Sequence, residues 1–435
     1  MQRTFIIHLS QLATPKGDGQ QRGSAMGNLR ILQDAAIFIE DGTIVFVGTT
    51  DEVLKQVHST VDCTVIDGTG KCAVPGFVDS HTHFIFGGYR PEEFLMRLQG
   101  AAYLDIMRAG GGIQSTVEQT RAASEETLMA LGKARLKEML AQGVTTVEGK
   151  SGYGLDLSCE QKQLRVMRTL NETGPVEVVP TYLGGHAVPP EYAGRTDAYI
   201  KFMLETVLPL IKEAHLAEFC DVFCEAGVFS VEQSRKLLAG AQELGFPSKI
   251  HADEIEPLGG AELAGELHAV SADHLLRASA DGIAALAKNK VVATLLPCTA
   301  FCLGKPYAPA RKMIDSGCAV ALASDFNPGS CFCDSIPLMI ALGVIHMGMT
   351  IEETLTALTL NGAAAVGRAD RIGSLEPGKQ ADVVLLGYPA YSFLAYHTGA
   401  NLVDTVLKKG TVVYENKMFH ESGFHNHPLV GRQHV

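Results

Sequence analysis

The sequence contains no tryptophan, only 7% aromatic residues, and fewer basic than acidic side chains. Its 36 Lys and Arg residues stand against 48 Asp and Glu residues, which gives a formal net charge of −12. Because nucleic acids and anionic membranes both bind basic surfaces, this balance argues against either of them as a partner. It leaves the class of small-molecule substrate open.

Signals for disulfides, secretion and membrane insertion are also missing. The ten cysteines in 435 residues include no Cys-x-x-Cys pair, so we expect reduced thiols packed in the interior. The longest uncharged stretch, residues 335–351, is interrupted by Pro337, two glycines and His346, and it fits a buried helix better than a membrane span. Residues 1–12 lack the basic and then apolar pattern of a signal peptide, and we expect a cytoplasmic protein.

The middle of the chain alternates strand-like and helix-like stretches. Amphipathic stretches predict helices at 125–142, 160–173, 230–244 and 261–267. Apolar runs predict eight strands at 74–84, 144–148, 176–182, 220–224, 249–251, 270–273, 291–296 and 319–324. Alternating strands and helices favour an α/β fold with a parallel sheet, and eight units favour closure into a (β/α)8 TIM-like barrel. The long insert 85–143 is expected to lie over one rim of that barrel.

The two ends of the chain differ from its middle, because both show short strand-like runs and turns in place of alternating strands and helices. Residues 37–48 and 403–414 each predict a hairpin, and 61–67 predicts a further strand. We therefore predict a small β-sandwich domain built from residues 1–73 and 371–435, and a barrel domain spanning 74–370. The polar tail from 420 to 435 is expected to be irregular; its His425 and His427 follow no apolar run, which makes a metal site there improbable.

The first barrel strand ends in His-Thr-His. Because side chains alternate faces along a strand, His81 and His83 project from the same side and can reach one metal ion. A His-x-His pair alone is weak support, but further polar residues follow the later strands, at the end of a barrel where active sites lie. These residues are Lys150, Tyr153, His186, Glu225, His251, Asp253, Glu254, His274, Asp325 and Asn327. Any one of these residues is explained by a structural role, such as a packed histidine or a carboxylate that caps a helix. Such roles do not explain the whole set.

Three imidazoles and one carboxylate suit a catalytic site for zinc or a similar first-row metal, which lowers the pKa of bound water. We assign His81, His83, His251 and Asp325 as the metal ligands. His274 is a further candidate ligand, although we favour contact with the substrate for it. Glu254, three residues after His251, is the candidate general base; a carboxylate in the first turn of a helix is the alternative interpretation.

The chain resembles the amidohydrolase superfamily in its His-Thr-His after an apolar strand, its later His, His and Asp, and the segment 373–384. Within that superfamily it resembles the imidazolonepropionase family over nearly its full length. The matching stretches are HTHFIFGGYR (81–90), RAGGGI (108–113), KSGYGL (150–155), GGHAVPPEY (184–192), HADE (251–254), SADHL (271–275) and DFNPGS (325–330). The resemblance implies one Zn²⁺ or Fe³⁺ per subunit and a homodimer.

It also implies hydrolysis of the cyclic amide of 4-imidazolone-5-propanoate to N-formimidoyl-L-glutamate, by attack of metal-bound hydroxide on the ring carbonyl. Arg90 offers a planar fork that can hold the substrate carboxylate with two hydrogen bonds. By the resemblance, substrate and product are bound by Arg90, Tyr153, His186, Glu254, Asn327, Gly329 and Ser330. In the implied division of roles, Glu254 deprotonates the water, His274 steadies the oxyanion and Asp325 passes a proton to the leaving nitrogen.

Some residues depart from the expected pattern. Cys298, Cys302, Cys331 and Cys333 lie at the expected rim, where the family more often has Gly or Ser at the first and third of these positions. They are interpreted as small packed side chains, with metal binding or sensitivity to oxidation as the alternative. Lys150 is interpreted as structural, because the resemblance is to the single-metal type. A cytosine- or guanine-type deaminase and a barrel without catalytic activity are the competing hypotheses; Arg90 and the motifs of Tyr153 and His186 argue against the first, and the complete ligand set argues against the second.

Overall fold

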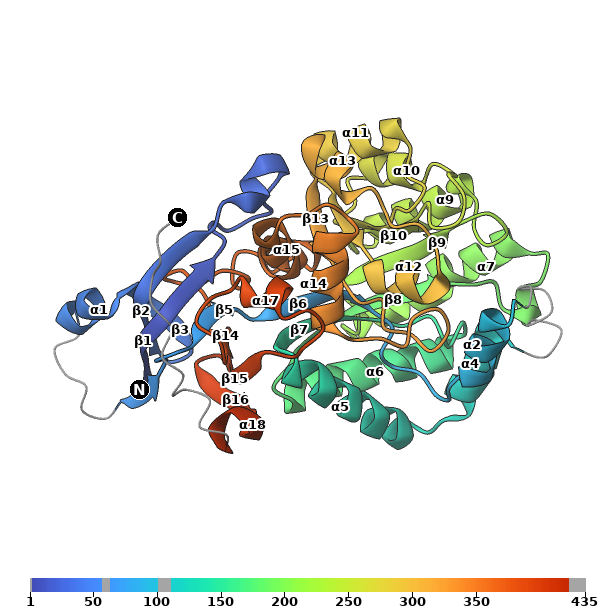
Figure 1. Ribbon diagram of the computed structural model, residues 1–435. Helices are drawn as coiled ribbons and strands as arrows, with labels where there is room; N and C mark the ends of the chain where they lie inside the picture. Colours follow the sequence, from blue (N-terminus) through green and yellow to red (C-terminus); the bar gives the residue numbers. More distant parts are fainter. Residues whose placement is uncertain (1, 57–62, 101–110, 422–435) are drawn as a thin grey trace.

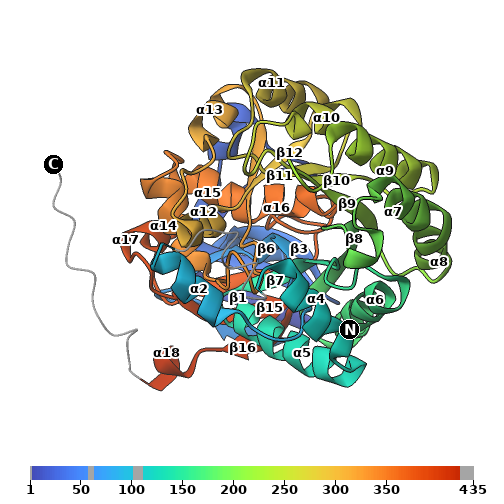
Figure 2. The same cartoon turned by 90° about the vertical axis from the view of Figure 1, so that its right-hand side faces the viewer.

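Eight parallel strands form the larger part of the protein, as Figures 1 and 2 show in the computed structural model, which describes residues 2–56, 63–100 and 111–421. The order of the strands in the sheet follows the chain. They are β6 (Phe77–Thr82), β7 (Val144–Lys150), β8 (Glu177–Gly185), β9 (Phe219–Cys224), β10 (Lys249–Ala252), β11 (Ser271–His274), β12 (Val292–Leu295) and β13 (Ala319–Leu322). Each coincides with one of the eight predicted apolar runs.

The barrel closes between its first and last strands. The backbone N–H of Asp325, just after β13, donates to the carbonyl of His81 at 3.0 Å, and that of His83 donates to the carbonyl of Phe326 at 2.9 Å. These two bonds place the His-Thr-His segment directly beside Asp325. The predicted (β/α)8 architecture is confirmed, and closure itself brings three of the four proposed ligands together.

Helices surround the strands (Figure 2). Several begin at a side chain that caps the exposed backbone N–H groups: Ser124 accepts from Thr127, Asp156 from Cys159, and Ser230 forms a capping box with Gln233. The helices of this part are α2 (Pro91–Leu98), α4 (Ile113–Ala122), α5 (Glu125–Ala141), α6 (Leu157–Thr173), α7 (Thr196–Phe202), α8 (Leu208–Glu213), α9 (Val231–Glu243), α10 (Gly260–Glu266), α11 (Ala280–Asn289), α12 (Pro297–Leu303), α13 (Ala310–Asp315), α14 (Ile336–Ile345), α15 (Ile351–Leu358) and α16 (Leu360–Ala365). Short 3-10 turns occupy Gly23–Gly27 and Pro190–Tyr192, and a π turn, Met203–Val207, joins α7 to α8. Of the insert 85–143, α2 and α4 lie across the barrel face turned to the viewer in Figure 2, as expected, whereas α5 packs beside α6 and β7.

The two chain ends meet in a second, mixed sheet, on the left in Figure 1. Its strands are β1 (Arg3–Thr14), β2 (Arg30–Glu40), β3 (Thr43–Thr49), β4 (Thr64–Asp67), β5 (Cys72–Pro75), β14 (Val383–Leu386), β15 (Val403–Lys408) and β16 (Thr411–Glu415). Strand β5 joins the ends, because it pairs with β1 on one side and with β14 on the other. Around the sheet lie α1 (Thr50–Gln56), α17 (Phe393–Tyr396) and α18 (Lys417–Glu421).

The strands of this small domain form one sheet that is continuous through β1, whose first half pairs with β4 and whose second half pairs with β5. Between these halves the register with β2 shifts, and His8 has a positive φ of 57°. Both predicted hairpins are present as β2–β3 and β15–β16. One aliphatic cluster, which includes Ile6, Ile37 and Leu385, unites strands from the two ends.

The uncharged stretch 335–351 contains α14, whose residues are mostly buried, as predicted. No helix among residues 2–56, 63–100 and 111–421 is long and apolar enough to cross a bilayer. His425, His427 and the first half of the motif at 108–113 lie outside the described residues.

Candidate active site

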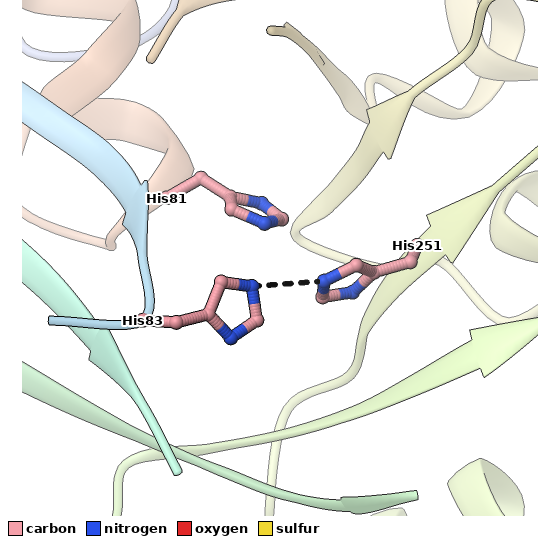
Figure 3. A group of neighbouring side chains, drawn as sticks. All are labelled: His81, His83 and His251. Atoms are coloured by element: carbon pink, nitrogen blue, oxygen red, sulfur yellow. Dashed lines mark hydrogen bonds between the residues drawn. The ribbon is translucent and has the colours of Figure 1, made fainter. Parts of the chain in front are cut away.

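Three histidine rings converge at the carboxyl ends of the barrel strands, as Figure 3 shows. His81 and His83 come from β6 and the residue after it, and His251 comes from β10. The Nε2 atoms of His83 and His251 lie 3.4 Å apart, and the ring centroids of His81 and His251 lie 4.5 Å apart. The structure thus brings together the three predicted imidazole ligands, with exposed fractions of 2% or less.

Asp325 completes this group from the other side of the barrel seam. Its Oδ1 lies 3.5 Å from Nε2 of His81 and 3.4 Å from Nε2 of His83. Its Oδ2 accepts a hydrogen bond of 2.7 Å from the hydroxyl of Thr299. Asp325 has a positive φ of 53°, a conformation that costs a non-glycine residue energy and is retained here at the centre of the cluster.

The donor atoms of this cluster fit a metal ion. Nε2 of His81 is buried without a hydrogen-bond partner, which is costly unless a ligand satisfies it. Burial is the main cause that lowers the pKa values of His83 and His251, so both rings are neutral and carry a lone pair. Three groups of potential ligands share His81: one with His83 and His251, one with His274 and Asp325, and one with Glu148 and Asp273. His274 therefore remains a possible ligand beside the four predicted ones.

Two buried carboxylates orient the ligand rings. Oδ2 of Asp273 lies 2.6 Å from Nδ1 of His81, and Oδ2 of Asp221 lies 3.0 Å from Nδ1 of His251. A carboxylate behind an imidazole fixes its tautomer and turns the other nitrogen toward the metal. Burial and Lys150 lower the pKa of His81, but Asp273 and Asp325 outweigh them and raise it to about 9. In the absence of a metal, both ring nitrogens of His81 therefore carry a proton at neutral pH.

The ammonium group of Lys150 contacts both Asp221 and Asp273. Its Nζ lies 2.7 Å from Asp221, 2.9 Å from Glu148 and 3.4 Å from Asp273. Lys249 lies 2.8 Å from the other oxygen of Glu148. Burial alone would lower the pKa of Lys150, yet Asp221 and Glu148 raise it well above its ordinary value, so the side chain is a cation. Lys150 is therefore enclosed by carboxylates, in agreement with its predicted structural role.

Glu254 and His274 lie together beside the metal-ligand cluster. Oε2 of Glu254 is 3.7 Å from Nδ1 of His274, and the ring of His274 lies 5.2 Å from that of His251. Burial raises the pKa of Glu254 above the ordinary 4.5, against the opposing effect of His274. A carboxyl group with a raised pKa beside the candidate metal ligands has the properties of a general base.

Two of the strand-end carboxylates support the loop that carries Glu254. The carboxylate of Asp253 accepts backbone hydrogen bonds from Gly259, Gly260 and Ala261. That of Glu225 accepts from the backbone N–H of Ile255 at 2.9 Å. Asp253 and Glu225 therefore hold this loop through hydrogen bonds, and in this way they position the candidate base Glu254.

Tyr153 and His186 lie beside His83, and Arg90 lies near Tyr153. The rings of His83 and His186 stack at 4.9 Å, and Tyr153 lies 5.3 Å from His186. Burial is the main cause that lowers the pKa of His186 to about 3. This neutral ring donates from Nδ1 to the carbonyl of Gly152 at 3.2 Å, so its Nε2 is a hydrogen-bond acceptor.

Arg90 depends on the loop after Asp325. A side chain at Gly329 would collide with the guanidinium group, so only glycine permits this approach. Nε of Arg90 is buried without a partner, and Nη1 has only a distant contact of 3.5 Å with Glu93. The guanidinium group therefore retains donors for an anionic ligand.

Asn327 and Ser330 shape the same loop. Oδ1 of Asn327 accepts from the backbone N–H groups of Gly329 and Ser330, both at 2.8 Å, and its Nδ2 donates to Ser330 Oγ and to the carbonyl of Asp325. In this geometry Asn327 holds the loop that presents Asp325, Gly329 and Ser330.

Sequence reasoning missed several residues of the site, namely Glu148, Asp221, Lys249, Asp273 and Thr299. All are buried with exposed fractions of 1% or less. The available signal was a charged residue inside an apolar strand, as in FCDVFC (219–224), because such a residue must be paired when it is buried.

Comparisons with known proteins agree with this geometry. A model of the "Amidohydrolase family" matches residues 100–414. The chain is 59% identical over 408 residues to imidazolonepropionase from Parabacteroides distasonis, covering 94% of this chain and 98% of that protein. It is 55% identical over 411 residues to imidazolonepropionase from Clostridium tetani, with the same two coverages.

Solved structures share the fold. A triazine hydrolase variant superposes with a TM-score of 0.75 at 18% identity, covering 95% of both chains. Guanine deaminase from E. coli superposes with a TM-score of 0.67 at 16% identity, covering 96% of this chain and all of that one. At such identities the likeness establishes the fold and does not distinguish between reactions.

Proposed function

The chain belongs to the imidazolonepropionase family of the amidohydrolase superfamily, and on that basis we propose how its own residues carry the reaction. It is a hydrolase of histidine degradation that opens the cyclic amide of 4-imidazolone-5-propanoate to give N-formimidoyl-L-glutamate. The observation that carries the residue assignment is the convergence of His81, His83, His251 and Asp325 beside the half-buried Glu254.

His81, His83, His251 and Asp325 would hold one Zn²⁺ or Fe³⁺, since three imidazoles and a carboxylate suit either ion. A bound ion supplies polarisation of the ring carbonyl and a water molecule whose pKa is near neutrality. The solved structure of atrazine chlorohydrolase TrzN from Arthrobacter aurescens, complexed with zinc, superposes with a TM-score of 0.66 at 18% identity, covering 95% of this chain and 96% of that one. That fold likeness is compatible with an ion here.

The substrate carboxylate is proposed to bind Arg90, whose unused donors lie next to Gly329 and Ser330. Nε2 of His186 accepts a hydrogen bond from a ring N–H, because Nδ1 is committed to the carbonyl of Gly152. The hydroxyl of Tyr153 adds a further polar contact. Asn327 acts by holding the loop, since both of its polar atoms are already bonded within that loop.

Proton transfer is assigned to three residues. Glu254 removes a proton from the attacking water at its carboxylate. His274, 3.7 Å from Glu254, stabilises the negative charge that develops on the carbonyl oxygen. Asp325 relays a proton that comes from the attacking water to the ring nitrogen that leaves, and Thr299 holds the carboxylate in place for this step.

We also propose that the protein is a cytoplasmic homodimer with a small-molecule substrate and without a nucleic-acid or membrane partner. The net charge of −12 supports the last part, because both kinds of surface attract basic proteins. Size-exclusion chromatography with light scattering tests the dimer.

The test of function is a product assay that separates hydrolysis of the imidazolone from deamination of a base. Metal-loaded protein is incubated with 4-imidazolone-5-propanoate, with guanine or with cytosine. We expect loss of the imidazolone chromophore with formation of N-formimidoylglutamate, and no ammonia from the two bases. Release of ammonia from guanine or cytosine, with the imidazolone unchanged, would contradict the proposal.

A further inference from the structure

The buried face of α6 carries two polar side chains, although the rest of that face is apolar. Glu160 and Gln163 lie one turn apart in this helix, with exposed fractions of 1% and 0%. The other buried residues of α6 are Cys159, Leu164, Val166, Met167 and Leu170. Burying a carboxylate or an amide costs free energy unless its polar atoms are hydrogen-bonded, so the partners of these two side chains are informative.

The carboxylate of Glu160 binds the backbone of the loop that follows β7. Its Oε1 accepts from the N–H groups of Gly152 at 3.1 Å, Gly154 at 2.9 Å and Leu155 at 2.8 Å. Its Oε2 lies 3.2 Å from the same N–H of Gly152. Leu155 has a positive φ of 57°, a conformation that costs a non-glycine residue energy. The shape of this loop therefore depends on the carboxylate of Glu160.

Gln163 joins the same loop to a second segment of the site. Its Oε1 accepts from the backbone N–H of Tyr153 at 3.3 Å, and its Nε2 donates to the carbonyl of Ile85 at 2.7 Å. Ile85 lies two residues after His83 and five residues before Arg90. Gln163 thus connects the loop of Tyr153 to the segment that carries a proposed metal ligand and the proposed carboxylate-binding arginine.

The loop in turn orients His186. Its ring lies 5.3 Å from that of Tyr153, and its Nδ1 donates to the carbonyl of Gly152 at 3.2 Å. A Cβ atom at Gly152 would lie 2.9 Å from Cβ of His186 and 2.7 Å from the carbonyl oxygen of Leu183, so the two segments are in close contact. The position of Gly152 therefore fixes both the direction of the imidazole and the nitrogen that carries its proton.

We propose that Glu160 and Gln163 are positioning residues for substrate binding, which hold residues 152–155 so that Tyr153 and His186 face the substrate ring. This inference rests on the proposed function, because it takes these two rings as contacts of the imidazolone. Neither positioning residue touches the substrate or the metal. Loss of their hydrogen bonds should therefore weaken substrate binding and leave metal binding intact.

The kinetic test compares Glu160→Gln and Gln163→Met with the unsubstituted protein, all loaded with zinc. The first replaces one acceptor oxygen with an amide donor, and the second removes both hydrogen bonds of the side chain. We expect KM to rise about tenfold in Glu160→Gln, with kcat changed less than about threefold, because a displaced substrate contact weakens binding. The rise should be smaller in Gln163→Met, whose bond to the loop is longer.

Glu353 provides a matched control. It is also a buried carboxylate, with an exposed fraction of 5%, and it accepts from the backbone N–H of Thr350 and contacts Arg311, neither of which belongs to the site. Glu353→Gln should lower Tm, as Glu160→Gln does, but should leave KM unchanged. The comparison separates a general loss of stability from a loss of positioning.

A second readout requires no turnover. Nitrogen NMR of the zinc-loaded protein with isotope-labelled histidine reports which ring nitrogen of His186 carries the proton, and His186→Gln assigns the signal. The unsubstituted protein should show the proton on Nδ1, and Glu160→Gln should show a mixture of the two tautomers. If the unsubstituted protein did not turn over the imidazolone, the proposed function would be wrong, and this spectrum would still decide whether Glu160 positions His186.

A KM in Glu160→Gln no higher than in Glu353→Gln, or an unchanged spectrum of His186, would overturn the proposal. Loss of zinc from either α6 variant, measured by elemental analysis, would also overturn it, because the two residues would then support the metal ligands. Gln163→Met decides the matter through its KM if Glu160→Gln does not fold.

Discussion

The barrel and the small domain are both built from buried strands, yet their buried charges lie in different places: behind the candidate site in the barrel, and in ion pairs such as Lys71–Asp404 beside an aliphatic cluster in the small domain. Inside the barrel, Lys150, Lys249 and Glu148 have exposed fractions of 0%. Inside the small domain, the cluster around Ile6, Ile37 and Leu385 is entirely aliphatic. Buried ion pairs contribute little net stability, because desolvation cancels much of their attraction. In the barrel the buried charges contact the candidate metal ligands, whereas in the small domain the aliphatic cluster contributes stability.

The largest effect is expected at the rim of the barrel, where charge acts on the substrate. Glu254→Gln keeps the shape of the side chain but cannot accept a proton. We expect kcat to fall about 10²- to 10⁴-fold, the usual contribution of a general base. Metal content, measured by elemental analysis, should be unchanged. Full activity with metal bound would show that another group is the base.

A matched pair of substitutions tests the comparison itself. Lys150→Met leaves Asp221, Asp273 and Glu148 without their cation, so metal affinity should fall about 10- to 100-fold. The free energy of unfolding should fall by about 3–5 kcal/mol. Ile37→Ala in the small domain should cost a similar amount, about 2–5 kcal/mol, through the cavity it leaves.

The two variants should differ in metal binding alone. Competition with a chelator on the metal-free proteins gives the dissociation constant, and denaturant titration gives the stability. Ile37→Ala should bind the metal as tightly as the unsubstituted protein. If both variants lost metal affinity to the same extent, the division of roles between the two interiors would be wrong.

Arg90→Lys tests recognition of the substrate carboxylate. It preserves the charge but loses the planar fork, so KM should rise about tenfold while kcat changes little. Initial rates over a range of substrate concentrations separate the two constants. An unchanged KM would place the carboxylate elsewhere.

The smallest effect is a shift in pH dependence. Glu254 must be deprotonated to act as a base, and burial raises its pKa above the ordinary 4.5. Activity should therefore decrease, as the pH falls, at a higher pH than an exposed glutamate would give. A profile of kcat/KM against pH measures this acidic limb, and the residual activity of Glu254→Gln should lack it. A limb at the ordinary pKa of glutamate would contradict the effect of burial.

The fold followed closely from the sequence because buried parallel strands appear as uninterrupted apolar runs. Each of the eight predicted runs became a strand of the barrel, and the helices 125–142 and 230–244 differ by only one or two residues from α5 and α9. In the small domain, the continuity of the sheet through β1 was not foreseen. That continuity depends on a shift in register near His8, and no local pattern encodes it.

The candidate metal ligands could be predicted from the sequence. The residues that contact and orient them could be predicted much less well. His81, His83, His251 and Asp325 follow apolar strands, so their clustering follows from the architecture of the barrel. The pairing of His81 with Asp273 and of His251 with Asp221 depends on neighbouring strands and becomes visible only in three dimensions. The same holds for the hydrogen bonds by which Asn327 holds its own loop, while its contact with substrate stays a prediction.

The most direct test of the central claim is turnover of 4-imidazolone-5-propanoate before chelation, after removal of the metal, and after metal is added back. The account predicts loss of the imidazolone signal with the native protein, none with the metal-free protein, and recovery at one metal ion per subunit. His251→Ala, which removes one proposed ligand, should not recover at that stoichiometry. Unchanged turnover by protein shown to contain no metal would contradict the four-ligand site.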